Sequence, residues 1–100
     1  MKKRSTLKVV AAAAVLAFAG LAQAQQTIKI ANIVELSGPG TTAGTLFKNG
    51  VELAVKEINE NGGILGKKIE STTVDTQTNP GVAKGLTQKA VDDGVLAIFG

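Results

Sequence analysis

A helix-like segment that ends in a glycine turn and restarts as a strand is the feature that most limits how this chain can fold. Apolar side chains recur at helical spacing there and predict one buried helix face. They are Leu46, Phe47, Val51, Ala54, Val55 and Ile58, and we expect Phe47 in the core. Asn61-Gly62-Gly63 predicts the helix end, because glycine reaches the left-handed backbone of a helix C-cap without a Cβ clash.

Strand-like and helix-like segments alternate along residues 27–99. We expect strands at 27–36, 68–75 and 95–99. The first helix is expected to begin near Thr42 or Ala43, and the second to begin at Asn79-Pro80 and end at Asp93-Gly94. The buried face of the second helix is expected to comprise Val82, Ala83, Leu86, Ala90 and Val91. The alternation predicts an α/β fold with a doubly wound parallel sheet, in which strand 27–36 lies between the other two.

The first 24 residues form a predicted signal peptide. Four Lys or Arg side chains precede an apolar run from Val9 to Leu21, and Ala22 and Ala24 match a small-residue cleavage site. We expect cleavage between Ala24 and Gln25. The alternative is an N-terminal membrane anchor, but the run is shorter than the roughly 20 residues of an ordinary span.

Composition excludes several kinds of chemistry. The chain contains no cysteine and no histidine, so Cys/His zinc sites, Cys/His nucleophile pairs, Ser/His/Asp triads and disulfides are all ruled out. We expect no catalytic residue, no bound metal and no cofactor. Without the leader, seven basic and eight acidic residues remain, and no basic stripe with interleaved aromatic residues predicts nucleic-acid binding.

The loop SGPGTTAG, residues 37–44, is the predicted ligand site. Ligands of open parallel sheets bind beyond the carboxyl ends of the strands, where the strand order reverses. We expect Gly38, Gly40 and Gly44 to let backbone amides approach a carboxylate or phosphate at the helix start. The candidate ligand-binding residues are Ser37, Gly38, Thr41, Thr42 and Ala43. The alternative is a tight turn in which Thr41 or Thr42 is merely the helix N-cap.

Two neighbouring features have simpler interpretations. The three glycines of the loop follow the spacing G-x-G-x-x-x-G, one residue longer than the dinucleotide-binding fingerprint. Asp75, at the end of strand 68–75, is interpreted as a turn-forming residue rather than a ligand contact.

Three segments together resemble the periplasmic Leu/Ile/Val-binding proteins, the substrate-binding subunits of branched-chain amino acid ABC transporters. The segments are ANIVELSGPGTTAG, NGVELAVKEINENGGILGKKIE and NPGVAKGLTQKAVDDGVLAIFG, and the resemblance covers Thr27 to Gly100. It implies a type I periplasmic binding fold with two lobes, of which residues 25–100 are the N-terminal part of the first.

The resemblance also implies a function. An amino acid or similar small solute binds between the lobes, a hinge closes, and the closed form docks on a membrane permease without covalent chemistry. The protein is expected to be periplasmic and monomeric. Residues 37–44 would contribute to the cleft, and the main first-lobe anchors would follow Gly100. Many relatives carry a bulky side chain near the position of Ala43, and relatives also bind amides, urea and aromatic acids.

Two other functions remain as alternatives. The same fold serves as the sensor domain of signalling receptors, which a transmembrane helix after residue 100 would favour. A nucleotide-dependent enzyme of the Rossmann type is disfavoured by the glycine spacing and by the predicted export.

Overall fold

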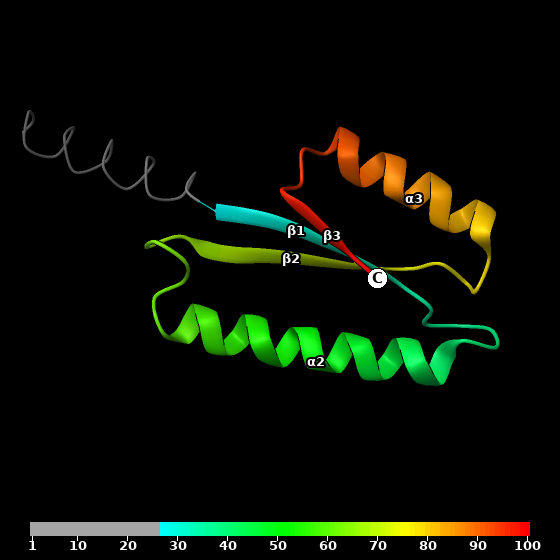
Figure 1. The fold of residues 1–100 in the computed structure, drawn as a ribbon, viewed down its shortest axis with the longest axis horizontal. Coiled ribbons are helices and arrows are strands. Elements are labelled where there is room, and N and C mark those ends of the chain that lie inside the picture. The colour runs from blue at the N-terminus through cyan, green and yellow to red at the C-terminus, as the bar shows by residue number, and fades with distance from the viewer. Residues whose placement is uncertain (1–26) are drawn as a thin grey trace, which may run out of the picture.

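The computed structural model describes residues 27–100, in which three parallel strands carry one helix on each face of the sheet (Figure 1). The elements are β1 (Thr27–Val34), α2 (Thr41–Glu60), β2 (Lys68–Asp75), α3 (Pro80–Asp92) and β3 (Ala97–Phe99). This arrangement confirms the predicted doubly wound α/β architecture. The predicted leader and its cleavage point lie outside the described residues. Neither helix in the described part is long and apolar enough to cross a membrane.

Strand β1 is the centre of the sheet, and the observed order β2-β1-β3 confirms the predicted order. Thr27 pairs with Lys68 and Val34 with Asp75, so β1 and β2 end at the same level. Successive side chains of a strand point to opposite faces, so β1 contributes to two cores. On the α3 side, Ala31 and Ile33 pack against Ala90, with Val74, Leu86 and Val95 around them.

A buried amide lies on the other face of β1. Asn32 is fully buried, and its Nδ2 group donates to Ser71 Oγ at 2.7 Å and to Thr73 Oγ1 at 3.3 Å. Both hydroxyls belong to β2, and Thr73 is the register partner of Asn32. The pair of bonds therefore links the two strands by side chains as well as by the backbone ladder.

Both helices end in the glycine cap that the sequence predicts. In α2, Gly62 has a φ of 97° and donates to Asn59 O, while Gly63 donates to Ile58 O. Helix α3 ends in the same way: Gly94 has a φ of 76° and donates to Val91 O. These bonds satisfy carbonyl groups that a helix end would leave without partners.

Three predicted boundaries are wrong by one or two residues. Strand β1 ends at Val34 rather than residue 36, because the Leu36 amide donates to the Asp75 carboxylate instead of to a strand. Helix α2 begins at Thr41, one residue before the predicted start. Strand β3 begins at Ala97 rather than residue 95, because the Val95 amide donates to Ala90 O as part of the α3 cap.

Part of each predicted buried helix face is exposed. On α2, Val51, Val55 and Ile58 are half-buried, as expected, whereas Ala54 is exposed. Phe47 is 40% exposed, so its assignment to the core is wrong. Two further residues of the predicted buried faces are also exposed, Leu46 on α2 and Val91 on α3. These positions lie on parts of the helices turned away from the three strands of residues 27–100.

Candidate functional site

The loop after β1 and the turn after β2 lie together at the carboxyl edge of the sheet. We call residues 37–44 the rim loop and residues 75–79 the support turn. They connect β1 to α2 and β2 to α3 (Figure 1). Several hydrogen bonds join them. The glycine turn between α2 and β2 lies at the opposite edge, which identifies it as scaffold.

The hydroxyl groups of two candidate ligand residues donate within the protein. Ser37 Oγ donates to Asp75 Oδ2 at 2.6 Å, and Thr41 Oγ1 donates to Gly38 O at 2.6 Å. Each oxygen can still accept a hydrogen bond, but its proton is already engaged. We therefore interpret Ser37 and Thr41 as residues that shape the rim loop.

Asp75 is the charged group at the centre of this arrangement. Its Oδ1 accepts hydrogen bonds from the amides of Leu36 at 2.9 Å, Ser37 at 3.1 Å and Gln77 at 2.8 Å. The hydrogen bond from the Ser37 hydroxyl and then the one from the Gln77 amide hold the pKa of Asp75 below its usual value, against a smaller opposing effect of burial. Asp75 is therefore a carboxylate at neutral pH, and the prediction that it forms a turn agrees with these contacts.

Thr42 and Ala43 form the exposed part of the candidate site. They occupy the second and third positions of α2, where backbone amides have no partner inside the helix. Gly40 is the N-cap, and within the described residues no side chain caps this end, so neither Thr41 nor Thr42 is the cap. Helix α3 starts at the same edge, but Asn79 Oδ1 caps it by accepting from the amides of residues 81 and 82.

The amides of Gly40 and Gly44 donate to Thr78 Oγ1 and to Gly40 O, so neither is left for a ligand, which corrects the expectation for these two glycines. A Cβ at Gly44 would overlap the Glu35 carbonyl oxygen, and a Cβ at Gly40 would lie 2.9 Å from the Glu35 side chain. The hydrogen bond from the Gly40 amide to Thr78 Oγ1 measures 3.0 Å. Gly38 is exposed with a φ of 81°, a backbone conformation that favours glycine.

Sequence reasoning missed Thr78 of the support turn. Its hydroxyl donates to Ser37 O at 2.8 Å as well as accepting from Gly40. The available signal was the run Thr76-Gln77-Thr78-Asn79, since such polar residues cluster in turns and bond nearby backbone groups. The contact with a loop almost forty residues earlier follows from the parallel pairing of β1 with β2.

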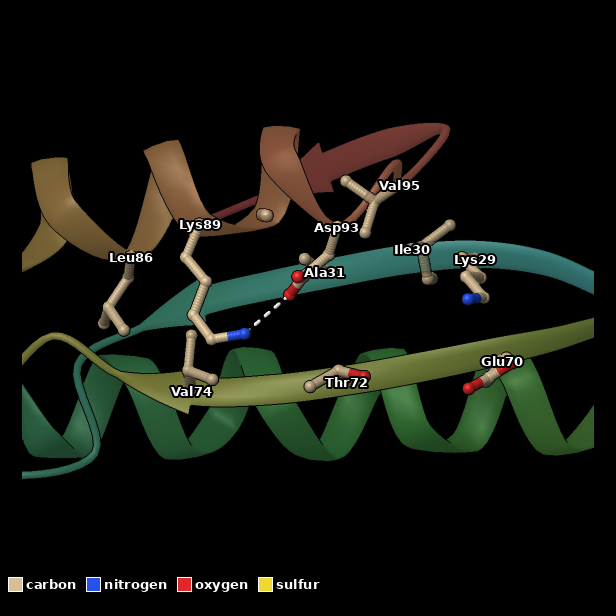
Figure 2. A pocket seen from close by; sticks show the side chains of 11 residues that line it. Lys29, Ile30, Ala31, Glu70, Thr72, Val74, Leu86, Lys89, Asp93 and Val95 are labelled. Atoms are coloured by element: carbon tan, nitrogen blue, oxygen red, sulfur yellow. Dashed lines mark hydrogen bonds and ion pairs between the residues drawn. The ribbon is translucent and has the colours of Figure 1, made fainter.

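A separate hollow of about 300 Å³ lies between α3 and the sheet, away from the rim loop (Figure 2). Ala31, Val74 and Leu86 contribute its apolar surface, and Lys89 and Asp93 lie at its polar side with an ion pair of 2.7 Å. The hydrogen bond from the Lys89 ammonium to Asp93 raises the pKa of Lys89. None of the candidate ligand residues lines this hollow.

The described residues contain no group of three or more acidic, histidine or cysteine side chains placed to hold a metal ion. The chemistry available at the carboxyl edge is that of hydrogen bonding: backbone amides, hydroxyl oxygens, the engaged carboxylate of Asp75 and the side chain of Glu35 beside Gly40. Such groups can hold a polar or anionic end of a small molecule.

The sequence is similar to those of known substrate-binding proteins. A Leu/Ile/Val-binding protein of Rhizobium johnstonii is 41% identical over 97 residues, which is 95% of this chain and 26% of the relative. The chain therefore spans about a quarter of the length of that relative.

Solved structures give the same result. A branched-chain amino acid transporter substrate-binding protein from Streptococcus pneumoniae, in complex with isoleucine, superimposes with a TM-score of 0.72 at 40% identity, covering 74% of this chain and 22% of that protein. A fatty acid ABC transporter substrate-binding protein from Thermomonospora curvata superimposes with a TM-score of 0.68 at 29% identity, covering 73% of this chain and 18% of that protein. The periplasmic binding protein family matches residues 27–100. The chain belongs to the periplasmic binding protein family.

Proposed function

We propose that this chain is the first part of an extracytoplasmic receptor that binds an amino acid, or a related small solute, and delivers it to the membrane permease of an ABC transporter. The observation that carries the proposal is the start of α2: it lies at the carboxyl edge of a parallel sheet, where open parallel sheets bind ligands, and no side chain of the described residues caps it. Thr42 and Ala43 are exposed there.

Physical chemistry supports a solute with a carboxylate. The first-turn amides of Thr42 and Ala43 and the positive end of the α2 dipole favour a negative group. The neighbouring α3 start does not offer the same amides, because Asn79 occupies them. In this proposal the rim loop forms one wall of the cleft, the rest of the protein supplies the other anchors, and no covalent step occurs.

The solute class is proposed from the relatives. The names of the compared proteins include Leu, Ile and Val, isoleucine and fatty acid as ligands, all of which pair a carboxylate with an aliphatic group. We propose a branched-chain amino acid first. Isothermal calorimetry of the full-length protein with leucine, isoleucine and valine tests this, with an aromatic acid, an aliphatic amide and a fatty acid as competing solutes. If none of them binds, the proposed function is wrong.

The Ala43 position tests whether the rim loop contacts the solute. Ala43→Trp adds a large side chain to an exposed position at the carboxyl edge, so we expect the dissociation constant to change at least fivefold while the thermal midpoint stays close to the parent. Ala54→Trp is the matched control, since Ala54 is exposed on the same helix three turns away from the rim. Equal affinities for the two variants would remove the rim loop from the binding site.

The export route and the permease are further parts of the proposal. We propose cleavage between Ala24 and Gln25 and a periplasmic location for the mature protein. Mass spectrometry of the exported protein checks the cleavage, and a mature chain that starts at Met1 would contradict it. Uptake of radiolabelled leucine by cells with and without the protein checks the permease, and unchanged uptake despite measured binding would favour a sensor role.

A further inference from the structure

We propose that the support turn sets the shape of the rim loop, so that Asp75 and Thr78 are positioning residues that control solute affinity without touching the solute. The inference rests on the proposed function only in taking the rim loop as a wall of the cleft. Four features of the described residues carry it: a carboxylate that accepts from loop amides, a hydroxyl that bridges two loop residues, a left-handed backbone in the support turn, and close contacts at two glycines.

The carboxylate of Asp75 fixes the first half of the rim loop. It accepts from the backbone amide and the hydroxyl of Ser37, and from the amide of Leu36 just before the loop. A fourth hydrogen bond, from the Gln77 amide, ties the same carboxylate to its own turn. Hydrogen bonds to a charged acceptor are stronger than those between neutral groups. The chain leaving β1 is therefore held in one direction.

The hydroxyl of Thr78 fixes the second half. It donates to Ser37 O at 2.8 Å and accepts from the Gly40 amide at 3.0 Å, so a single oxygen bridges the residues on either side of the tight turn. Gly40 is the N-cap residue and immediately precedes Thr41, the first residue of α2. The position of the exposed first helical turn, with Thr42 and Ala43, thus depends on this bridge.

The support turn that carries the Thr78 hydroxyl has a strained backbone. Gln77 and Thr78 have φ values of 57° and 55°, in the left-handed region that non-glycine residues rarely occupy. For a β-branched residue such as threonine this conformation is a true outlier. It persists only where surrounding contacts fix it, and such strain is concentrated at functional sites. The Thr76 hydroxyl, which accepts from the Thr78 amide at 3.2 Å, is one of those contacts.

Close packing leaves the rim loop little freedom to move. A Cβ at Gly38 would lie 3.0 Å from Thr78 Oγ1, and a Cβ at Gly40 would lie 3.1 Å from the same atom. Both glycines therefore fit directly against the threonine side chain. A rim loop held in one conformation loses less conformational freedom when a solute binds, which increases affinity.

The central test replaces only the bridging hydroxyl. Thr78→Val keeps the shape of the side chain and removes both hydrogen bonds, and Thr78→Ser restores the hydroxyl. Thr87→Val is the matched control, because the Thr87 hydroxyl donates to Ala83 O on the exposed surface of α3, far from the rim loop. Each variant is made in the full-length protein. Two quantities are measured: the exchange rate of the Gly40 amide by NMR, and the dissociation constant for leucine, isoleucine and valine by calorimetry.

We expect Thr78→Val to speed exchange of the Gly40 amide about fivefold, because that amide loses its one acceptor. Binding should weaken about tenfold, because the rim loop loses both hydrogen bonds of the Thr78 hydroxyl. Thr78→Ser should recover most of both losses, and Thr87→Val should change neither by more than about twofold. If the role of Thr78 were merely structural, Thr78→Val would lower the thermal midpoint and leave affinity unchanged.

A second pair of variants repeats the test at the carboxylate. Asp75→Asn removes the charge and the acceptor of the Ser37 hydroxyl, while Asp93→Asn makes the same change at an exposed aspartate at the other end of α3. We expect weaker binding in Asp75→Asn and parent affinity in Asp93→Asn. Equal affinity of these two variants would contradict a positioning role for Asp75.

The outcomes separate this inference from the proposed function. If the parent binds a solute and Thr78→Val binds it within twofold of the parent, the inference is wrong and the proposed function stands. Unchanged exchange of the Gly40 amide in Thr78→Val would also overturn it. If the parent binds none of the three amino acids, the solute assignment fails, whereas the exchange measurement still decides whether Thr78 holds the rim loop.

Discussion

Two glycines of α2 should respond to the same substitution in opposite directions. Gly50 has no atom within 4 Å of the place where a Cβ would be, so Gly50→Ala should only improve helix propensity. At Gly44 a Cβ would overlap the Glu35 carbonyl oxygen and lie 2.9 Å from the Glu35 nitrogen. These are backbone atoms, which cannot turn away as a side chain can. Gly44→Ala therefore requires the start of α2 to move away from the end of β1.

The magnitude follows from two opposing effects. Alanine in place of glycine inside a helix gains about 1 kcal/mol. Overpacking of a close contact costs about 1–3 kcal/mol, and we take the upper end because both sides of the contact are backbone. Gly44→Ala should thus lose about 2 kcal/mol and Gly50→Ala gain about 1 kcal/mol, a separation of about 3 kcal/mol.

Urea denaturation followed by circular dichroism measures this difference. With a slope of about 2 kcal/mol per molar, the two unfolding midpoints should differ by about 1.5 M. The slope itself should stay constant, which shows that the change lies in stability rather than in the extent of unfolding. If Gly44→Ala proves as stable as Gly50→Ala, the close approach of α2 to β1 is wrong.

Three smaller changes give further checks. Asn79→Ala should destabilise the protein by about 1 kcal/mol in urea denaturation, because two α3 amides lose their cap. The hydrogen bond from the Ser37 hydroxyl lowers the pKa of Asp75. The Asp75 carboxylate therefore stabilises the fold above pH 3.8, the usual pKa of the group, and this contribution is lost as pH falls through the lowered pKa. Acid unfolding should therefore be less steep in Asp75→Asn, and an identical pH profile would contradict this. Lys89→Met should change the unfolding free energy by less than about 1 kcal/mol, since its pair with Asp93 is exposed.

Local sequence signals predicted the framework well because local physics determines it. The cap at Asn79, the glycines at the two helix ends and the alternation of periods all act within a few residues of the chain, and the structure confirms each of them. The parallel order of the strands follows from that alternation and from the handedness of the crossovers.

Features that depend on distant contacts were predicted less well. Phe47 has the spacing of a core residue, yet the three described strands do not cover it. Gly44 suggested a ligand contact, but its neighbour is the backbone of Glu35. The polar run around Thr78 indicated only a turn, because the partners of its hydroxyl become neighbours only when β2 aligns with β1. Periodicity identifies which face of an element is apolar, but it does not identify what that face meets.

The central position of β1 has a consequence for how the fold assembles. Of the three described strands, β1 is synthesised first, and both of its partners come later in the chain. Thr27 pairs with Lys68, which is 41 positions later in the chain, and Ile30 pairs with Ala97, which is 67 positions later. Such long loops make pairing slow, because chain entropy is lost before the contacts form. Until β2 and β3 have been made, β1 is an apolar strand with two unpaired edges that can pair with other chains, so residues 27–34 are the part of this sheet most exposed to aggregation during synthesis.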